Sequence, residues 1–465
     1  MTQPEKTTNA WTVLRESGHR PRFFVLCLGI WLQGVNTTLV STLLPSAVPE
    51  IGGAHLVGWA FTVYLVGSII AGAATALTVR RFGLQRCLVG AAALYTVGCS
   101  IAAISNTMPM LLCARIIQGS GGGWIVGLTF VAVNRLFPNE ILPRLMSMIS
   151  VMWSLAAFTG PLVGGTFATY VSWRYAFWAF GFQGVLFGLL AFATMGGLSV
   201  PQLTKPPRFP IRRLAVLASS ILLVALSGTT VHMVWTPVCL IGAVALMVLF
   251  LKLDGRHDES RMLPPHPLSQ KSATGAGLCM IFLLGVATMS YAVFGPFLMV
   301  LLHGASPLMA GYMVAIESVS WGIMAVLVGG ASVRWEPTFI RIGGAMVLAG
   351  TVWMVFAVPA GPLLFIAPGA FLAGGGFGIM WGFVTRRLIA AAPLDERDRT
   401  AGAIPAVQQT SYAVAGALAG LVANWAGFSD TMDRATAEHV AFWVFAAFVP
   451  LCVWGWLMAM KVARA

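Results

Sequence analysis

Two charged residues stand inside long apolar stretches of the sequence, where a charge is costly. Arg115 begins the run RIIQGSG, and Glu317 lies in the run AIESVSW. Insertion scales assign about 2.5 to 3.5 kcal/mol to an arginine at the centre of a bilayer. Burial disfavours the charged form of a carboxyl, so Glu317 can exchange protons as a cavity opens to either side. We therefore predict Glu317 and Arg115 as proton-coupling residues.

Each of these two residues also has a structural alternative. Arg115 can serve as a tether to the carbonyl groups of neighbouring helices, and Glu317 can be a buried acid that hydrogen-bonds between helices or binds the substrate without cycling protons. The two charges are expected to face each other. If they do, the arginine favours the ionised carboxylate.

The elements that position these residues must be membrane helices. Of the 465 residues, 58% are hydrophobic and 9% are charged, and the mean hydropathy is +0.84. One soluble core cannot hide so many apolar side chains. The net charge of +13 comes without a dense basic run, so we expect no nucleic-acid partner. The seven cysteines show no paired ligand spacing, and we expect neither a metal nor a cofactor.

Apolar stretches long enough to cross a bilayer recur along the whole chain. Twenty-five of the 28 basic residues fall in segments that are cytoplasmic if both termini lie inside, the exceptions being Arg115, Arg174 and Arg434. Cytoplasmic loops are enriched in Lys and Arg, so an even number of spans is predicted. The fourteen predicted spans are 22–45, 55–78, 87–105, 108–133, 145–170, 175–197, 214–231, 234–251, 273–302, 308–330, 339–358, 362–385, 402–426 and 439–460.

Two polar cytoplasmic segments divide these spans into six, two and six. The alternative is twelve spans, with 214–251 dipping into the membrane as a hairpin. The division predicts an all-α integral membrane protein of two six-helix bundles and a central extra helix pair, typical of transporters built from internal repeats. The predicted parts are a cytoplasmic tail at 1–21, an N-terminal bundle at 22–197, a linker with two spans at 198–272, and a C-terminal bundle at 273–465.

A second motif lies in the predicted fifth span, where a proline among glycines favours a kink and close packing. Its residues are Gly160, Pro161, Gly164 and Gly165. Together with Arg115-x-x-Gln-Gly-x-Gly, this pattern resembles the major facilitator superfamily, specifically its fourteen-helix drug/proton antiporter branch. The resemblance implies that the fifth-span motif is the conformational motif of an antiporter.

Two positions depart from the pattern of that branch. Asn36 stands where the branch usually has an aspartate in the first helix, and Arg80 stands where the loop after the second helix has an aspartate. Neither side chain can supply the carboxylate that the family pattern provides.

Polar and aromatic side chains on the predicted helices are candidates for the lining of a substrate cavity. Aromatic faces and amides suit a planar solute that is neutral or weakly charged. The candidates are Gln33, Asn36, Gln118, Trp124, Trp153, Tyr291, Phe294, Trp321, Trp381, Gln408, Gln409 and Tyr412.

These features predict a secondary active transporter, not an enzyme, in the cell inner (cytoplasmic) membrane. The leading expectation is proton-coupled efflux of small aromatic or lipophilic organic solutes by alternating access, with a monomer as the working unit. The alternative is an uptake transporter for an aromatic metabolite or a vitamin such as riboflavin. The expected partners are a small-molecule substrate, protons and the lipid bilayer.

Overall fold

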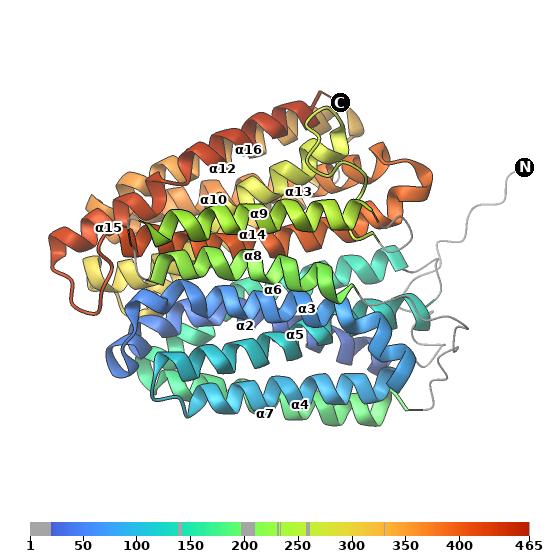
Figure 1. Cartoon of the computed structure of the whole chain (residues 1–465), viewed down its shortest axis with the longest axis horizontal. Helices are drawn as coiled ribbons and strands as arrows, with labels where there is room; N and C mark the ends of the chain where they lie inside the picture. The colour runs from blue at the N-terminus through green and yellow to red at the C-terminus, as the bar shows by residue number, and fades with distance from the viewer. Residues whose placement is uncertain are drawn as a thin grey trace, which may run out of the picture.

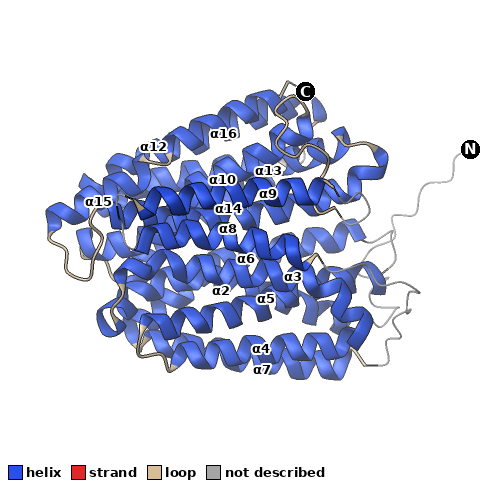
Figure 2. Cartoon of the chain, viewed as in Figure 1, coloured by secondary structure: helices blue, strands red, loops and turns tan. Residues whose placement is uncertain are grey.

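The computed structural model describes residues 20–137, 142–196, 210–229, 232, 234–256, 261–329 and 331–464. The described residues form helices and contain no strand (Figure 2). The first long helices are α2 (Arg20–Ile51), α3 (Val57–Phe82), α4 (Leu84–Ala103), α5 (Met108–Leu136), α6 (Leu142–Tyr170) and α7 (Trp173–Thr194). Two further helices follow, α8 (Ile211–Thr229) and α9 (Trp235–Gly255). The last are α10 (Ala273–His303), α11 (Pro307–Val328), α12 (Glu336–Ala360), α13 (Ile366–Ala391), α14 (Arg397–Trp425), α15 (Arg434–Ala446) and α16 (Val449–Val462).

Thirteen candidate spans among the described residues are long and apolar enough to cross a membrane, α15 and α16 together forming one of them. The remaining long helix, α14, has 29 residues but carries charges in its first turn and several amide and hydroxyl side chains further on. With α14, the helices account for the fourteen predicted spans. The predicted all-α membrane fold is confirmed.

Side-chain caps and turn residues set several helix ends. The hydroxyls of Thr107, Ser172 and Ser306 accept hydrogen bonds from backbone N–H groups in the first turns of α5, α7 and α11. Such caps satisfy donors that the start of a helix leaves free. Gly304 ends α10 with a φ of 59°, a left-handed conformation that favours glycine.

Two differences from the predicted spans occur at prolines. α2 continues to Ile51 with Pro45 and Pro49 inside it, whereas the predicted span ends at residue 45. Membrane helices tolerate proline because neighbouring helices can satisfy the backbone groups that it frees. The predicted span 439–460 is divided into α15 and α16, because Pro450 in the first turn of α16 cannot continue the preceding helix.

Helices α2 to α7 pack on one another, and so do α10 to α16. We call these sets the N-bundle and the C-bundle. They occupy the lower and upper parts of Figure 1, and α8 and α9 run across the front between them. The bounds of the predicted parts stay a prediction, and their segments 1–19 and 198–209 lie outside the described residues.

Two close contacts join the bundles at the side where α2 ends and α3 begins, which the predicted topology assigns to the cell exterior. A Cβ on Gly58 of α3 would lie 2.5 Å from the carbonyl oxygen of Gly416 in α14. A Cβ on Gly311 of α11 would lie 2.5 Å from the carbonyl oxygen of Pro161 in α6. We call these contacts the α3–α14 seam and the α6–α11 seam. The backbone N–H of Leu308 also donates to Thr169 Oγ1 across the second seam, at 3.1 Å.

The extra helix pair covers the α3–α14 seam. Helix α8 packs against both α3 and α14. The indole N–H of Trp59 in α3 donates to the carbonyl of Ala225 at 3.1 Å, and the amide of Asn424 in α14 donates to the carbonyl of Gly228 at 2.5 Å. Helix α8 is therefore hydrogen-bonded to one helix of each bundle.

A buried ion pair joins α8 and α9 at the end that the predicted topology assigns to the cytoplasm. Arg213 Nη1 of α8 lies 2.6 Å from Asp254 Oδ1 of α9, and both side chains are buried. Asp254 also accepts hydrogen bonds from the backbone N–H groups of Met262 and Leu263. One carboxylate thus holds α8, α9 and the segment that follows α9 together.

Replacing Asp254 with asparagine is expected to lower the thermal unfolding midpoint clearly. Removing one partner of a buried ion pair typically costs about 3 to 5 kcal/mol. The control is Glu438→Gln, which makes the same kind of change in a pair whose side chains are 76% and 42% exposed, and exposed pairs contribute about 0 to 1 kcal/mol. Equal midpoints for the two variants in a fluorescence thermal-shift assay would show that the Asp254 pair adds no stability.

Candidate functional site

Arg115 of α5 is fully buried and is held by acceptors from three helices of the N-bundle. Its Nη1 donates to Asn36 Oδ1 of α2 at 2.5 Å and to Gln118 Oε1 of α5. Its Nε donates to the carbonyl of Ala60 in α3 at 3.2 Å, and its guanidinium carbon lies 3.9 Å from the centre of the Tyr64 ring. A cation over an aromatic face is stabilised by the ring quadrupole. All of these groups are uncharged, so the guanidinium is satisfied without a carboxylate.

The polar residues around Arg115 are themselves hydrogen-bonded within the N-bundle. The hydroxyl of Tyr64 donates to Gln33 Oε1 (2.5 Å), Asn36 Nδ2 donates to the hydroxyl of Tyr95 (3.0 Å), and Gln118 Nε2 donates to Cys99 Sγ (3.0 Å). The side chains of Gln33, Asn36 and Gln118 are buried. In this conformation they form a cage around the arginine, and their predicted role in a substrate cavity stays a prediction.

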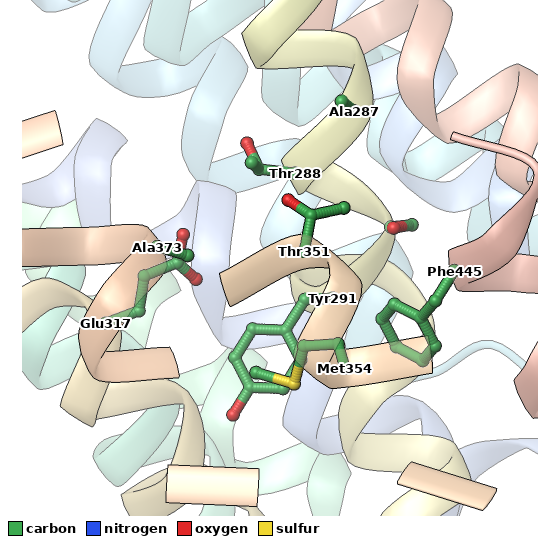
Figure 3. Close-up of a pocket in the computed structure, with 9 residues that line it drawn as sticks. Ala287, Thr288, Tyr291, Glu317, Thr351, Met354, Ala373 and Phe445 are labelled. Carbon is green, nitrogen blue, oxygen red and sulfur yellow. The ribbon is translucent and has the colours of Figure 1, made fainter. Parts of the chain in front are cut away.

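Glu317 lies in the middle of α11 and lines a pocket in the C-bundle (Figure 3). The pocket has about 260 Å³ of empty space. Among the residues that the structure describes, the Glu317 carboxyl has no hydrogen-bond or ion-pair partner. The other lining residues are Ala287, Thr288, Ser290 and Tyr291 of α10, Thr351 and Met354 of α12, Ala373 of α13 and Phe445 of α15.

The structure holds the two membrane charges apart. The hydrogen-bond partners of Arg115 lie on α2, α3 and α5, whereas Glu317 faces residues of the C-bundle. The expectation that the two charges face each other is therefore not met in this conformation. The predicted roles of Glu317 and Arg115 in proton coupling stay a prediction.

Unpaired polar atoms lie on the same bundle as Glu317. Tyr291 is buried, and its hydroxyl has no hydrogen-bond partner among the described residues. The side-chain oxygen Oε1 of Gln409 is also buried and has no partner among them. Buried polar groups normally have a partner, so an unpaired one is a place where water or a ligand can bind. Gln408 differs, because its amide donates to the hydroxyl of Tyr412 at 2.9 Å.

The predicted aromatic candidates serve mainly in packing in this conformation. Trp321, one turn after Glu317, stacks on Phe377 with ring centroids 5.2 Å apart. Trp381 lies 5.8 Å from Trp321, so the three rings form one aromatic cluster. The remaining candidates have these neighbours: Phe294 contacts Phe428, Trp124 donates to Thr78 Oγ1, and Trp153 lies beside Gly34.

The glycine–proline motif of α6 lies between two helices. Gly160 and Gly164 face Thr38 and Thr42 of α2 so closely that a Cβ does not fit. Gly165 faces the backbone of Pro307 in α11, where a Cβ would lie 2.6 Å from the carbonyl oxygen. The motif thus lies between α2 of the N-bundle and the α6–α11 seam.

Several residues of the site were not predicted from the sequence. Tyr64 and Tyr95 complete the arginine cage, and Thr288, Thr351 and Met354 line the Glu317 pocket. Tyrosine, threonine and methionine are common in membrane helices, so the sequence does not mark these five residues as part of a site. For the α3–α14 seam a signal was present, because Gly416 and Gly420 have the spacing of small residues at which membrane helices approach closely.

Comparisons with known proteins agree with this architecture. The family model of the Major Facilitator Superfamily matches residues 26–416. A relative named "Probable multidrug-efflux transporter" from Mycobacterium tuberculosis H37Rv is 29% identical over 468 residues, which covers 96% of each chain. A relative named as an efflux pump from Dothistroma septosporum is 25% identical and covers 65% of this chain and 54% of its own.

Solved structures show the same fold at lower identity. A D-xylose–proton symporter superposes with a TM-score of 0.62 at 18% identity and covers 93% of this chain and 96% of its own. A peptide transporter of the POT family, in complex with sulfate, superposes with a TM-score of 0.66 at 16% identity and covers 95% of each chain.

Proposed function

Because the chain belongs to the major facilitator superfamily and is a multi-pass membrane transporter, we propose that it exports small aromatic or lipophilic organic solutes in exchange for protons. The proposed location is the cytoplasmic membrane, and the proposed working unit is the monomer. Glu317 carries this proposal, since it is a carboxyl in the middle of a membrane helix that lines a pocket and has no partner in the described part of the chain. Intramembrane acids of this kind mark proton pathways.

Export is supported by two further observations. The α6 motif resembles that of antiporters, and the structure places it against the α6–α11 seam. Relatives that align along most of this chain are named as multidrug-efflux transporters. Small residues at a seam allow helix backbones to meet and separate without trapping side chains.

Uptake of an aromatic metabolite, such as riboflavin, is the second candidate. It is favoured by Asn36, which stands where the antiporter branch usually has an aspartate and which here accepts a hydrogen bond from Arg115. The N-bundle therefore offers no carboxyl at this position to carry a proton. We therefore place the proposed proton coupling in the C-bundle, at Glu317.

The proposed cycle is a rocking of the bundles about a central site. In the conformation described here the seams on the predicted outer side are closed. Opening toward the exterior requires α3 to separate from α14 and α6 from α11. Proton binding and release at Glu317 would bias this equilibrium.

Glu317→Gln is expected to reduce pH-gradient-driven accumulation to that of protein-free liposomes, because glutamine keeps the size of the side chain and cannot release a proton. The measurement is the flux of ethidium and of riboflavin, both fluorescent, into oriented proteoliposomes under an imposed pH gradient. Passive exchange of the solute without a gradient should persist. Glu438→Gln, the same change at an exposed site, is the control.

The outcomes separate the candidates. Ethidium movement against the proton gradient that is lost in Glu317→Gln supports the antiporter. Saturable riboflavin movement without ethidium flux supports the importer. Unchanged gradient-driven pumping by Glu317→Gln removes Glu317 from the coupling mechanism.

A further inference from the structure

The Glu317 pocket lies inside one bundle and not between the two. Its described lining residues come from α10, α11, α12, α13 and α15, all of the C-bundle, and none comes from the N-bundle. Substrate sites of transporters with this repeat plan lie at the interface of the repeats. The pocket is therefore displaced from the interface where a transported solute would be exposed to each side in turn.

The size of the pocket also separates it from a substrate site. The room that it leaves for the centres of water-sized molecules is about 20 Å³, and about 10 to 15 Å³ on this measure is needed for one water. Its walls combine the hydroxyls of Thr288 and Thr351 with the apolar side chains of Met354 and Phe445. Such a space accommodates a proton on the carboxyl and about one water. It does not accommodate a planar polycyclic solute unless the bundle itself expands.

Among the described residues, no cation is positioned to neutralise the ionised carboxylate. The titratable groups that face Glu317 are Tyr291 of α10 and Tyr412 of α14. The residues that line the pocket from α12, α13 and α15 have no titratable side chain, and Arg115 is engaged in the N-bundle. An unpaired carboxylate in this apolar space is unfavourable, so loss of the proton favours a conformation in which water reaches Glu317.

Helix α11 connects this event to the α6–α11 seam. The backbone of Glu317 packs against Gly374 of α13 with no room for a Cβ, so α11 and α13 move together at this level. Gly311 lies six residues earlier on the same helix, about 9 Å along its axis, and it contacts the backbone of Pro161 in α6. A displacement of α11 that admits water to Glu317 therefore acts on the seam.

We propose that Glu317 binds the coupled proton at a site separate from the substrate site, and that its protonation closes the α6–α11 seam through α11. The proposal rests on the proposed function in taking Glu317 as the coupled acid. Proton and substrate then do not compete for the same carboxylate. They are coupled through the position of one helix.

The first test is equilibrium binding of ethidium, or of riboflavin if that is the solute that moves, to purified wild type and Glu317→Gln. The proposal predicts that the variant retains the wild-type dissociation constant within a few-fold. If the carboxylate contacts the solute, its loss should weaken binding by more than about tenfold. That result would assign Glu317 to the substrate site and overturn the proposal.

The second test measures the seam directly and needs no substrate. Spin labels at Tyr170 and Met309, exposed residues near the outer ends of α6 and α11, report the distance across the seam in a cysteine-free background that still transports. The distance in wild type should lengthen from mildly acidic to mildly alkaline buffer, Glu317→Asp should keep this response, and Glu317→Gln should stay short in both buffers. A distance that does not change with pH in wild type would overturn the proposal, even if flux shows that Glu317 is the coupled acid.

Discussion

Gly58→Ala is expected to reduce transport by about tenfold or more while leaving the folded yield close to that of the wild type. The added Cβ would lie 2.5 Å from the Gly416 carbonyl oxygen and 2.9 Å from the Gly420 Cα. Both are backbone atoms of α14, so no side chain can rotate away. Overpacking of a closed contact costs about 1 to 3 kcal/mol, and about 1.4 kcal/mol changes an equilibrium constant tenfold.

The position of this contact explains why transport should be more sensitive than folding. Gly58 and its neighbours belong to different bundles, and the contact must open when the outer side opens. The clash therefore disfavours the conformation described here and not the packing within either bundle. Initial transport rates in proteoliposomes and monodispersity in detergent measure the two effects.

Gly242→Ala is the matched control, since it adds the same methyl group on the peripheral helix α9. There a Cβ would lie 3.4 Å from a side-chain carbon of Leu223, which is an ordinary contact. Transport by this variant should equal that of the wild type. If Gly58→Ala also transports normally, the α3–α14 seam does not close during the cycle.

Arg115→Met is expected to lower the folded yield severely, with little change in the transport rate per folded molecule. Methionine fills part of the space but donates no hydrogen bond, so the oxygens of Asn36, Gln118 and Ala60 lose their donor. Each buried polar group left unpaired costs about 1 to 3 kcal/mol. Because these partners belong to α2, α3 and α5, the loss falls on the N-bundle.

The role of Arg115 is decided by comparing the transport rate per folded molecule with the yield of folded protein. Arg434→Met provides the control, because Arg434 pairs with Glu438 at the protein surface, where the two side chains are 76% and 42% exposed. Its yield should remain near that of the wild type, since exposed pairs contribute little. A folded Arg115→Met that has lost gradient-driven transport would instead assign the arginine to proton coupling.

The membrane fold could be predicted from the sequence because lipid imposes one simple requirement. Each span needs about 20 apolar residues, and the basic residues mark the loops, so the helices were found with errors at their ends. The errors follow from tertiary context. Pro45 and Pro49 lie within α2, and Pro450 separates α15 from α16. The sequence shows the positions of the prolines, but it does not show which neighbouring groups hydrogen-bond to the backbone carbonyls that each proline leaves free.

The candidate site was predicted less completely. Glu317 and Arg115 could be identified because charges inside apolar stretches are rare. The residues around them could not be identified, since the rotation of each helix about its axis decides which side chains face one another. Gln33 and Gln118 are predicted to line a cavity, which stays a prediction, and in this conformation they lie in the cage of Arg115, together with Tyr64. That Asn36 is a hydrogen-bond acceptor of Arg115 could not be predicted from the sequence either.

The extra helix pair makes the two flanks of the transporter unequal toward lipid. On the flank of α3 and α14, α8 packs over the seam, and α9 presents apolar side chains outward, such as Ile241 and Val244. Among the described residues, α8 and α9 do not pack against the flank of α6 and α11. A lipophilic molecule dissolved in the bilayer therefore meets a shielded flank on one side and a bare junction of two bundles on the other. The α6–α11 flank is therefore the more accessible of the two to molecules that approach the seams from the bilayer.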